Sequence, residues 1–183
     1  QPEAHPRLHP QALLLQKSGQ PGTKFVSDIP AGPVLADLDA TMIGQALTNL
    51  IKNGGEAIES LQEKSPPEGH SPEIRVVMTL HPEAVEITIS DNGIGLPPDR
   101  ARLFEPYVTT REKGTGLGLP IVKKIIEEHG GTLALERAEA FDDTGRHGAM
   151  AVIRLPVLAL LQTESDINEL EADAVPAETT FKM

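Results

Sequence analysis

The apolar residues of this 183-residue chain recur with two different periods, and each period predicts one type of element. Over 39–61 they return every three or four positions, which predicts one long amphipathic helix with Asp39 or Thr41 as its N-cap. The same spacing predicts a second helix over 120–129, with Pro120 in its first turn and two glycines after it. Each helix should bury one face.

Alternation of apolar and polar positions predicts strands in the second half of the chain. Residues 74–80 and 85–89 alternate in this way around a short turn that contains a proline, which predicts a hairpin. Two further strands are expected at 132–137 and 149–155. The alternation matches the two-residue period of a half-buried sheet.

Shorter segments are predicted near the start of the chain and within its glycine-rich centre. The β-prone segments 25–29 and 34–36 flank a Pro-Ala-Gly-Pro turn, so we expect them to form a small strand pair. Between 91 and 118, glycines predominate, and the only regular element expected is a helical turn at about 99–104. Functional chemistry is therefore expected in this central stretch.

Composition excludes several classes of protein. The formal net charge is -11, which disfavours a general nucleic-acid binder because such proteins need clustered cations. The absence of cysteine rules out disulfides and thiolate zinc sites and is typical of a reducing compartment. No apolar stretch reaches the about 20 residues that a membrane-spanning helix needs. With four Phe, one Tyr and no Trp, aliphatic residues should fill the core.

Asn49 and Asn53 lie four positions apart on the first predicted helix, so both side chains share one face. An amide oxygen is an uncharged ligand that suits Mg²⁺ when phosphate oxygens and waters complete the coordination. Considered alone, the pair is more often two asparagines on a solvated face.

Two glycine-rich groups follow. Asp91-Asn-Gly-Ile-Gly95 comes directly after a predicted strand, where a carboxylate can accept from an exocyclic amine and glycines allow a flat ring to approach. An ordinary Asp-Asn-Gly turn explains this group equally well. Residues 114–118 hold three glycines before a predicted helix and can offer backbone N–H groups to an anion. A lone glycine loop is a weak indication of function.

Together, the order and spacing of these groups resemble the N, G1, F and G2 boxes of the sensor histidine kinase ATP-binding domain. The matching residues are Asn49 and Asn53, then Asp91, Gly93 and Gly95, then Phe104 to Tyr107, then Gly114, Gly116 and Gly118. The resemblance covers residues 23–156. The short segment 106–114, which runs directly into Thr-Gly-Leu-Gly-Leu, looks most like the nitrogen-regulation kinases of the NtrB and NtrY kind.

The resemblance implies the Bergerat ATP-binding fold that gyrase, Hsp90 and MutL share. This is an α/β two-layer sandwich, in which a mixed, mostly antiparallel sheet packs on three helices beside a flexible ATP lid. Residues 1–22 would then be an N-terminal remnant, or first helix, leading from a missing dimerisation domain, and residues 23–156 the catalytic domain. Residues 157–183 are expected to be an acidic, disordered tail.

The resemblance also implies roles for individual residues, with ATP and Mg²⁺ as cofactors. Asp91 would accept from the adenine amino group, Asn53 would ligate Mg²⁺, and Asn49 would contact phosphate or a metal-bound water. Gly93 and Gly95 would admit the base. The other residues expected to contact the nucleotide are Thr109, Gly114, Thr115, Gly116, Leu117 and Gly118.

Asn49 separates a kinase from an ATPase within this superfamily, because the ATPases carry a glutamate base four residues before the metal-binding asparagine. An amide cannot take a proton from water, so hydrolysis should be slow and the γ-phosphate should pass to a histidine. On the lid, Arg111 or Lys113 would offset the charge of that phosphate during transfer. Lid solubility accounts for these two charges equally well.

The expected function is that of a catalytic domain only, because the acceptor-histidine motif is absent and the isolated chain should not autophosphorylate. Its expected partners are the dimerisation and histidine-phosphotransfer domain of the same full-length protein and a cognate response regulator. Nucleic acid and membrane contacts are not expected. The domain should be a monomer on the cytoplasmic face, with the full-length protein anchored in the inner membrane.

Alternatives to this reading remain open. Gly54 and Gly55 stand where an alanine commonly follows the metal-binding asparagine, and a glycine inside a helix costs up to about 1 kcal/mol relative to alanine. Nucleotide affinity would then be weakened, and the chain would be a degenerate nucleotide-binding or docking module without phosphotransfer. A superfamily ATPase is disfavoured by Asn49. A dinucleotide dehydrogenase is disfavoured because the glycine loop follows a charged lid rather than a strand.

Overall fold

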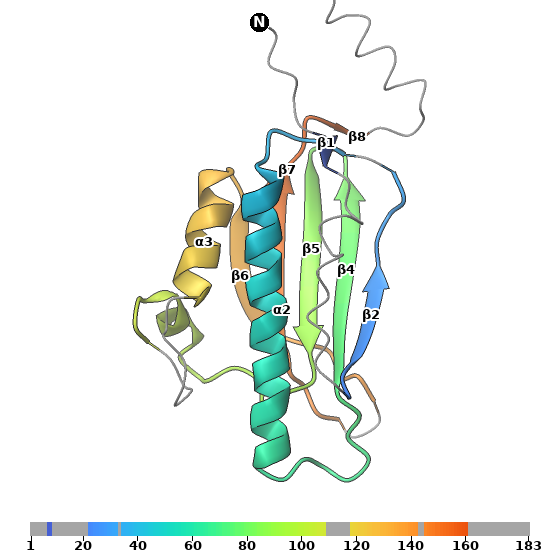
Figure 1. The fold of residues 1–183 in the computed structure, drawn as a ribbon, viewed down its shortest axis with the longest axis vertical. Coiled ribbons are helices and arrows are strands. Elements are labelled where there is room, and N and C mark those ends of the chain that lie inside the picture. Colours follow the sequence, from blue (N-terminus) through green and yellow to red (C-terminus); the bar gives the residue numbers. More distant parts are fainter. Residues whose placement is uncertain (1–6, 9–21, 33, 109–117, 143–144, 161–183) are drawn as a thin grey trace, which may run out of the picture.

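The computed structural model describes residues 7–8, 22–32, 34–108, 118–142 and 145–160. Within these ranges the chain forms two layers, a five-stranded sheet and two α-helices that lie over one of its faces (Figure 1). The strands of this sheet are β2 (Lys24–Asp28), β4 (Glu73–His81), β5 (Ala84–Asp91), β6 (Thr132–Arg137) and β7 (Ala149–Pro156).

The strand order is β2-β4-β5-β7-β6, and every pair is antiparallel except β2 with β4. The hairpin of β4 and β5 and the two final strands confirm the predictions from alternation. The sheet is mixed and mostly antiparallel, so the predicted α/β two-layer class is also confirmed.

The long predicted helix is α2 (Ala40–Glu63), and the second is α3 (Gly118–Glu128). Asp39 caps α2, because its side chain accepts from the N–H groups of residues 41 and 42, as one of the two predicted caps should. After α3, Gly130 has a φ of 75°, a left-handed backbone that glycine adopts at low cost. A 3-10 helix, η1 (Arg100–Phe104), confirms the predicted central turn.

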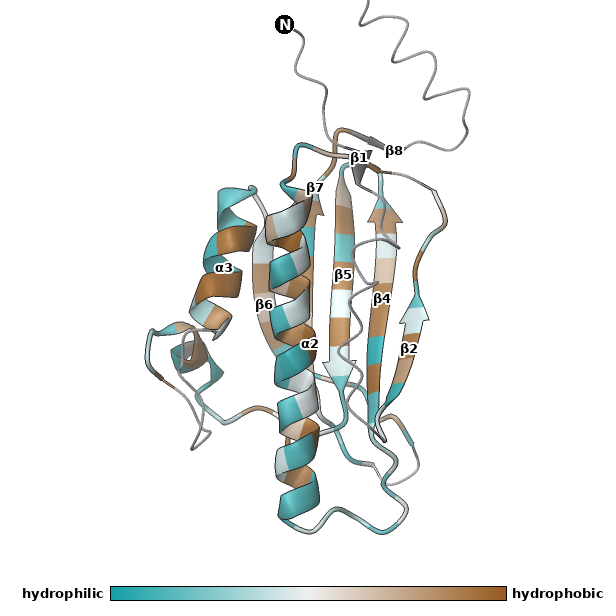
Figure 2. Cartoon of the chain, viewed as in Figure 1, coloured by the Kyte–Doolittle hydropathy of each residue, from teal (hydrophilic) through white to brown (hydrophobic). Residues whose placement is uncertain are grey.

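The core lies between the helices and the sheet. Alternate residues of the central strands face the helices, and Ile87 of β5 is paired in register with Ile153 of β7, both fully buried. In Figure 2, hydrophobic segments recur at intervals along α2 between hydrophilic ones. The apolar residues of α2 that are buried in this core recur every three or four positions and include Ile43, Ala46, Leu47, Leu50, Ile51, Ile58 and Leu61.

The predicted strand pair near the start of the chain is wrong. β2 instead pairs in parallel with β4, while β3 (Val34–Leu35) pairs antiparallel with β1 (Arg7–Leu8) and β8 (Ala159–Leu160) in a second, three-stranded sheet. A parallel pair needs a long crossover, which α2 supplies between β2 and β4. β2 and β3 are adjacent in the chain, but each pairs with a strand that is far away in the sequence.

The division of the chain at residues 22 and 156 stays a prediction. Paired strands lie on both sides of it, because β1 and β8 join β3, and Val157 is buried. The first of the three expected helices falls in 1–22, of which only 7–8 and 22 are described, and the acidic tail beyond 160 is outside the described ranges. No helix in the described part is long and apolar enough to cross a membrane.

Candidate functional site

The end of β5 and the start of α3 both lie beside the middle of α2. A methyl group added at Gly118, the first residue of α3, would lie 3.9 Å from Asn53 Oδ1. Gly54 follows Asn53 in α2. A methyl group added at Gly54 would lie 3.3 Å from Asp91 Cβ and 3.6 Å from Asp91 Oδ2. Consecutive residues of α2, Asn53 and Gly54, thus lie close to two groups that the sequence predicted to share one site.

Asp91 is the last residue of β5 and is only 6% exposed. Its Oδ1 accepts a hydrogen bond from the N–H of Gly93 at 2.9 Å, which holds the carboxylate at the turn. An ionised carboxylate has about four lone-pair sites, so it can accept from several donors at once. Burial next to an apolar helix also favours a donor that forms a hydrogen bond over bulk water.

Gly93 and Gly95, the two glycines after Asp91, are each required for a different structural reason. A methyl group at Gly93 would lie 2.4 Å from the carbonyl carbon of Ala57, so only glycine allows the turn to touch the backbone of α2. The adjacent Ile94 N–H donates to the Ala57 carbonyl at 3.1 Å. Gly95 has a φ of 80°. The expected contact of Gly93 and Gly95 with a base stays a prediction.

The segment before β7 packs against the turn that follows β5. This contact was not predicted from the sequence. A methyl group at Gly148 would lie 1.8 Å from the Asp91 carbonyl oxygen, and Arg146 Nε donates to the Gly93 carbonyl at 3.4 Å. The only signal in the sequence was a glycine directly before β7. The end of β5 is thus enclosed by α2 on one side and by this segment on another.

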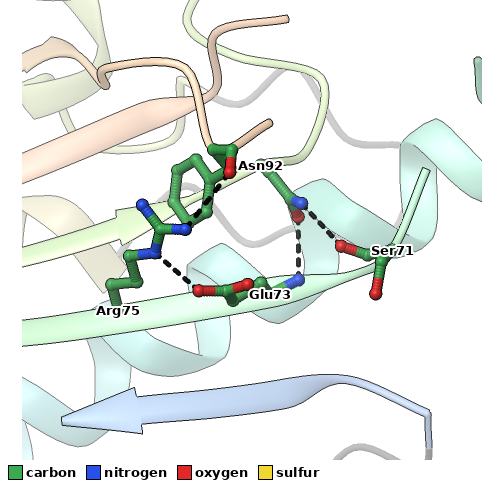
Figure 3. A network of polar contacts seen from close by, with 5 residues as sticks. Ser71, Glu73, Arg75 and Asn92 are labelled. Carbon is green, nitrogen blue, oxygen red and sulfur yellow. Dashed lines mark hydrogen bonds and ion pairs between the residues drawn. The ribbon is translucent and has the colours of Figure 1, made fainter. Parts of the chain in front are cut away.

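Asn92 was also missed as a functional candidate. Its side chain is buried. Figure 3 shows that it is bonded to Glu73, the first residue of β4, and to Ser71, two positions earlier in the chain. In the same network, Arg75 binds Glu73 and lies over the ring of Phe141, with 4.1 Å between the guanidinium carbon and the ring centre. An asparagine inside an Asp-Asn-Gly turn gives no sign in the sequence that it is buried.

Asn49 lies one turn before Asn53 on α2 and is half-buried, so the two amides share a helix face as predicted. Several predicted site residues fall outside the described ranges, namely Thr109, Arg111, Lys113, Gly114, Thr115, Gly116 and Leu117. Their roles stay predictions.

The electrostatic character of the site comes from few groups. The first turn of α3 has no acidic residue, so its backbone N–H groups and the positive end of its dipole can face an anion. Among the described residues, no cluster of three or more His, Cys, Asp or Glu side chains could hold a metal. A hard cation here would take an amide oxygen from Asn53 and its other ligands from an anionic ligand and water, which Mg²⁺ accepts.

A comparison with protein families agrees with this geometry. Residues 38–159 match the family described as histidine kinase-, DNA gyrase B-, and HSP90-like ATPase. The chain belongs to this family. The match includes α2, β4, β5, α3, β6 and β7, and therefore all the described residues of the candidate site.

Curated relatives within this histidine kinase-, gyrase- and HSP90-like family include the nitrogen regulation protein NtrY of Azorhizobium caulinodans. It is 48% identical over 129 residues, which are 70% of this chain and 16% of that protein. The sensor histidine kinase ZraS of Salmonella typhimurium is 43% identical over 81 residues, covering 44% of this chain and 16% of that protein. The chain thus spans less than a fifth of either relative, and the resemblance to NtrY-type kinases is confirmed.

Among solved structures, the catalytic domain of the histidine kinase ThkA superposes with a TM-score of 0.60 at 26% identity. The alignment covers 84% of this chain and 95% of the ThkA domain. The family's fold therefore accounts for most of the described chain, including the layer of helices that carries Asn53 and Gly118.

Proposed function

We propose that this chain is the ATP-binding catalytic domain of a two-component sensor histidine kinase. The proposal rests chiefly on one observation, the meeting of Asn53, Asp91 and Gly118 at the middle of α2. These residues come from three boxes of the family, in the family's order. The domain would bind Mg-ATP and supply the γ-phosphate to a histidine of a separate dimerisation domain, for onward transfer to a response regulator.

The base end of the nucleotide would be recognised by Asp91. Its carboxylate is buried, is fixed by the Gly93 N–H, and lies where α2 has no side chain at Gly54. A charged acceptor in such surroundings forms a stronger hydrogen bond with an exocyclic amine than it would in water. This gives Asp91 the role of selecting a purine that carries an amino group.

The phosphate end would lie beside Asn53 and the start of α3. The Asn53 oxygen would bind Mg²⁺, and the backbone N–H groups at Gly118 would face the phosphates. Mg²⁺ neutralises phosphate charge when it is bound. From the glycine loop, Gly114, Gly116 and the intervening residues would add further N–H donors. Arg111 or Lys113 would contribute positive charge.

Asn49 favours transfer of the phosphate over its hydrolysis. It occupies the helix turn before Asn53, where a catalytic base for water would be placed, and an amide has no basic lone pair for a proton. Asn49 would instead orient a phosphate oxygen or a bound water. The full-length protein would be anchored in the inner membrane, with this domain as a monomer on the cytoplasmic face.

Phosphotransfer is the direct test of this function. The chain is mixed with the dimerisation domain of its own full-length protein and with ATP labelled at the γ-phosphate, and we expect an acid-labile, base-stable label on that domain. A His-to-Gln variant of the acceptor is the control. Nucleotide binding without any label would support the docking-module alternative, and rapid phosphate release by the chain alone would support an ATPase.

Asn53→Ala should abolish the dependence of nucleotide binding on Mg²⁺. In the unmodified chain we expect Mg²⁺ to strengthen binding of a non-hydrolysable ATP analogue by roughly tenfold or more. In the variant, Mg²⁺ should leave the affinity unchanged. Calorimetric titration with and without Mg²⁺ measures both. Gln45→Ala, which removes an exposed amide from the same helix, is the matched control. A variant that keeps the full Mg²⁺ effect would refute Asn53 as the ligand.

A further inference from the structure

Asp91 and Asn92 are the only polar or charged residues classed as buried in the described ranges, and they are adjacent. Asn92 is 3% exposed, although a primary amide is costly to bury without partners. The proposed function assigns a role to Asp91 but none to Asn92. The contacts of Asn92 therefore call for a separate explanation.

Four hydrogen bonds hold Asn92 to the start of β4 and the loop before it. Its Oδ1 accepts from the Glu73 N–H at 2.9 Å, and its Nδ2 donates to the Ser71 carbonyl at 2.7 Å. Both side-chain bonds are drawn in Figure 3. Its own N–H donates to the Glu73 carbonyl at 3.3 Å, and its carbonyl lies 2.8 Å from His70 Nε2. Both the side chain and the main chain of this residue are thus fixed.

His70 extends the same support to the end of α2. Its Nδ1 lies 2.9 Å from Gln62 Nε2, which is a donor, so Nδ1 accepts and Nε2 carries the proton that is donated to Asn92. The His70 ring, in the loop between α2 and β4, is therefore bonded on one side to the helix and on the other side to the turn after β5.

These bonds fix the peptide that donates a hydrogen bond to the Asp91 carboxylate. The peptide between Asn92 and Gly93 contains both the carbonyl that His70 holds and the N–H that donates to Asp91 Oδ1. If the Asn92 side chain is lost, its two bonds to the region at the start of β4 are lost as well, and the Gly93 N–H is held less firmly against the carboxylate. Hydrogen bonds weaken steeply when donor and acceptor are misaligned, so a ligand amine would be bound less well.

We propose that Asn92 is a positioning residue for base recognition, which orients the Asp91 carboxylate and so sets the preference for purines that carry an exocyclic amine. This inference rests on the proposed function, in which Asp91 accepts from that amine. Asn92 does not contact the nucleotide. Removing it should change selectivity for the base and leave the affinity for the phosphate end largely intact.

The test compares ADP with inosine diphosphate, which has the same phosphates but no exocyclic amine. Calorimetric titration should give the unmodified chain an about 10- to 100-fold preference for ADP, the range expected for one hydrogen bond to a charged group. In Asn92→Ala this preference should fall by at least about fivefold, with the affinity for inosine diphosphate changed less than about threefold. Equal weakening of both ligands, with the preference intact, would overturn the proposal.

Two further variants keep the result decisive. His70→Ala removes only the bond to the Asn92 carbonyl and the one to Gln62, and it should lower the preference by a smaller factor, which also serves if Asn92→Ala does not fold. His129→Ala also loses two hydrogen bonds, one to Ile125 in α3 and one to Asp39 at the start of α2, far along that helix from Gln62. This variant should keep the full preference.

The failures of the two proposals can be told apart. If the unmodified chain binds both diphosphates equally, the role of Asp91 is wrong, and the role of Asn92 falls with it. If the unmodified chain prefers ADP and both Asn92→Ala and His70→Ala keep that preference, only the role of Asn92 is wrong. A loss of preference in His129→Ala as large as in Asn92→Ala would also overturn it, because the effect would then not be local.

Discussion

Gly148→Ala should lower the melting temperature of this domain by roughly 6–12 °C, equivalent to about 3 kcal/mol of unfolding free energy. The added methyl group would lie 1.8 Å from the Asp91 carbonyl oxygen, a distance that no relaxed structure allows. The atom in the way belongs to the backbone of β5, which is held by its neighbours on both sides and cannot move as a flexible side chain would. Thermal unfolding followed by circular dichroism measures the change.

Gly44→Ala is the matched control for Gly148→Ala. It adds the same methyl group inside α2 at a position where, apart from the two adjacent residues and the nearby backbone of the helix itself, no atom lies within 4 Å. The variant should therefore gain about 0.5–1 kcal/mol from helix propensity. Its melting temperature should therefore rise by a few degrees. A Gly148→Ala variant as stable as the unmodified chain would contradict the close packing of this segment on the end of β5.

Asp91→Asn should weaken ADP binding by at least about tenfold, and by up to about 150-fold, because it replaces a charged acceptor at the proposed base site with a neutral amide. The amide oxygen can still accept from the Gly93 N–H, so the turn and the melting temperature should be preserved. The amide nitrogen of the new side chain can only donate, and it would face the donating amine of the base. Calorimetric titration with ADP measures the loss.

Asp37→Asn is the matched control for Asp91→Asn, since it removes the same charge at an exposed position before α2. Its affinity for ADP should equal that of the unmodified chain. Tight ADP binding by Asp91→Asn would exclude Asp91 as the acceptor of the amine and would move base recognition to another group.

Periodicity predicted the elements of this fold well, because burial on one face imposes a repeat that the sequence carries directly. The apolar positions of α2 and the alternation in β4 and β5 are of this kind. The pairing of β2 and β3 was not predictable in the same way, because strand propensity says nothing about which partner a strand meets. Both segments pair with strands far away in the chain.

The candidate site was predictable in part. The family resemblance placed Asn53, Asp91 and Gly118 in one site, and the structure brings these residues together through α2. Gly54 was read from sequence only as a cost to the helix. The structure adds a packing reason, because a methyl group there would lie 3.3 Å from Asp91 Cβ, tighter than most real contacts. Whether Gly54 weakens nucleotide affinity is not tested by this contact, so that effect stays a prediction.

The contact between the turn after β5 and the backbone of α2 has a thermodynamic consequence for ligand binding. Gly93 lies directly on Ala57, and the Ile94 N–H donates to the Ala57 carbonyl, so the proposed base acceptor and the proposed metal ligand belong to one preorganised unit. Ordering a loop or side chain on binding subtracts from affinity. Since Asp91 needs no such ordering, that cost would not be subtracted from the free energy of its bond with a base, whether the ligand is a nucleotide or a nucleoside without phosphates.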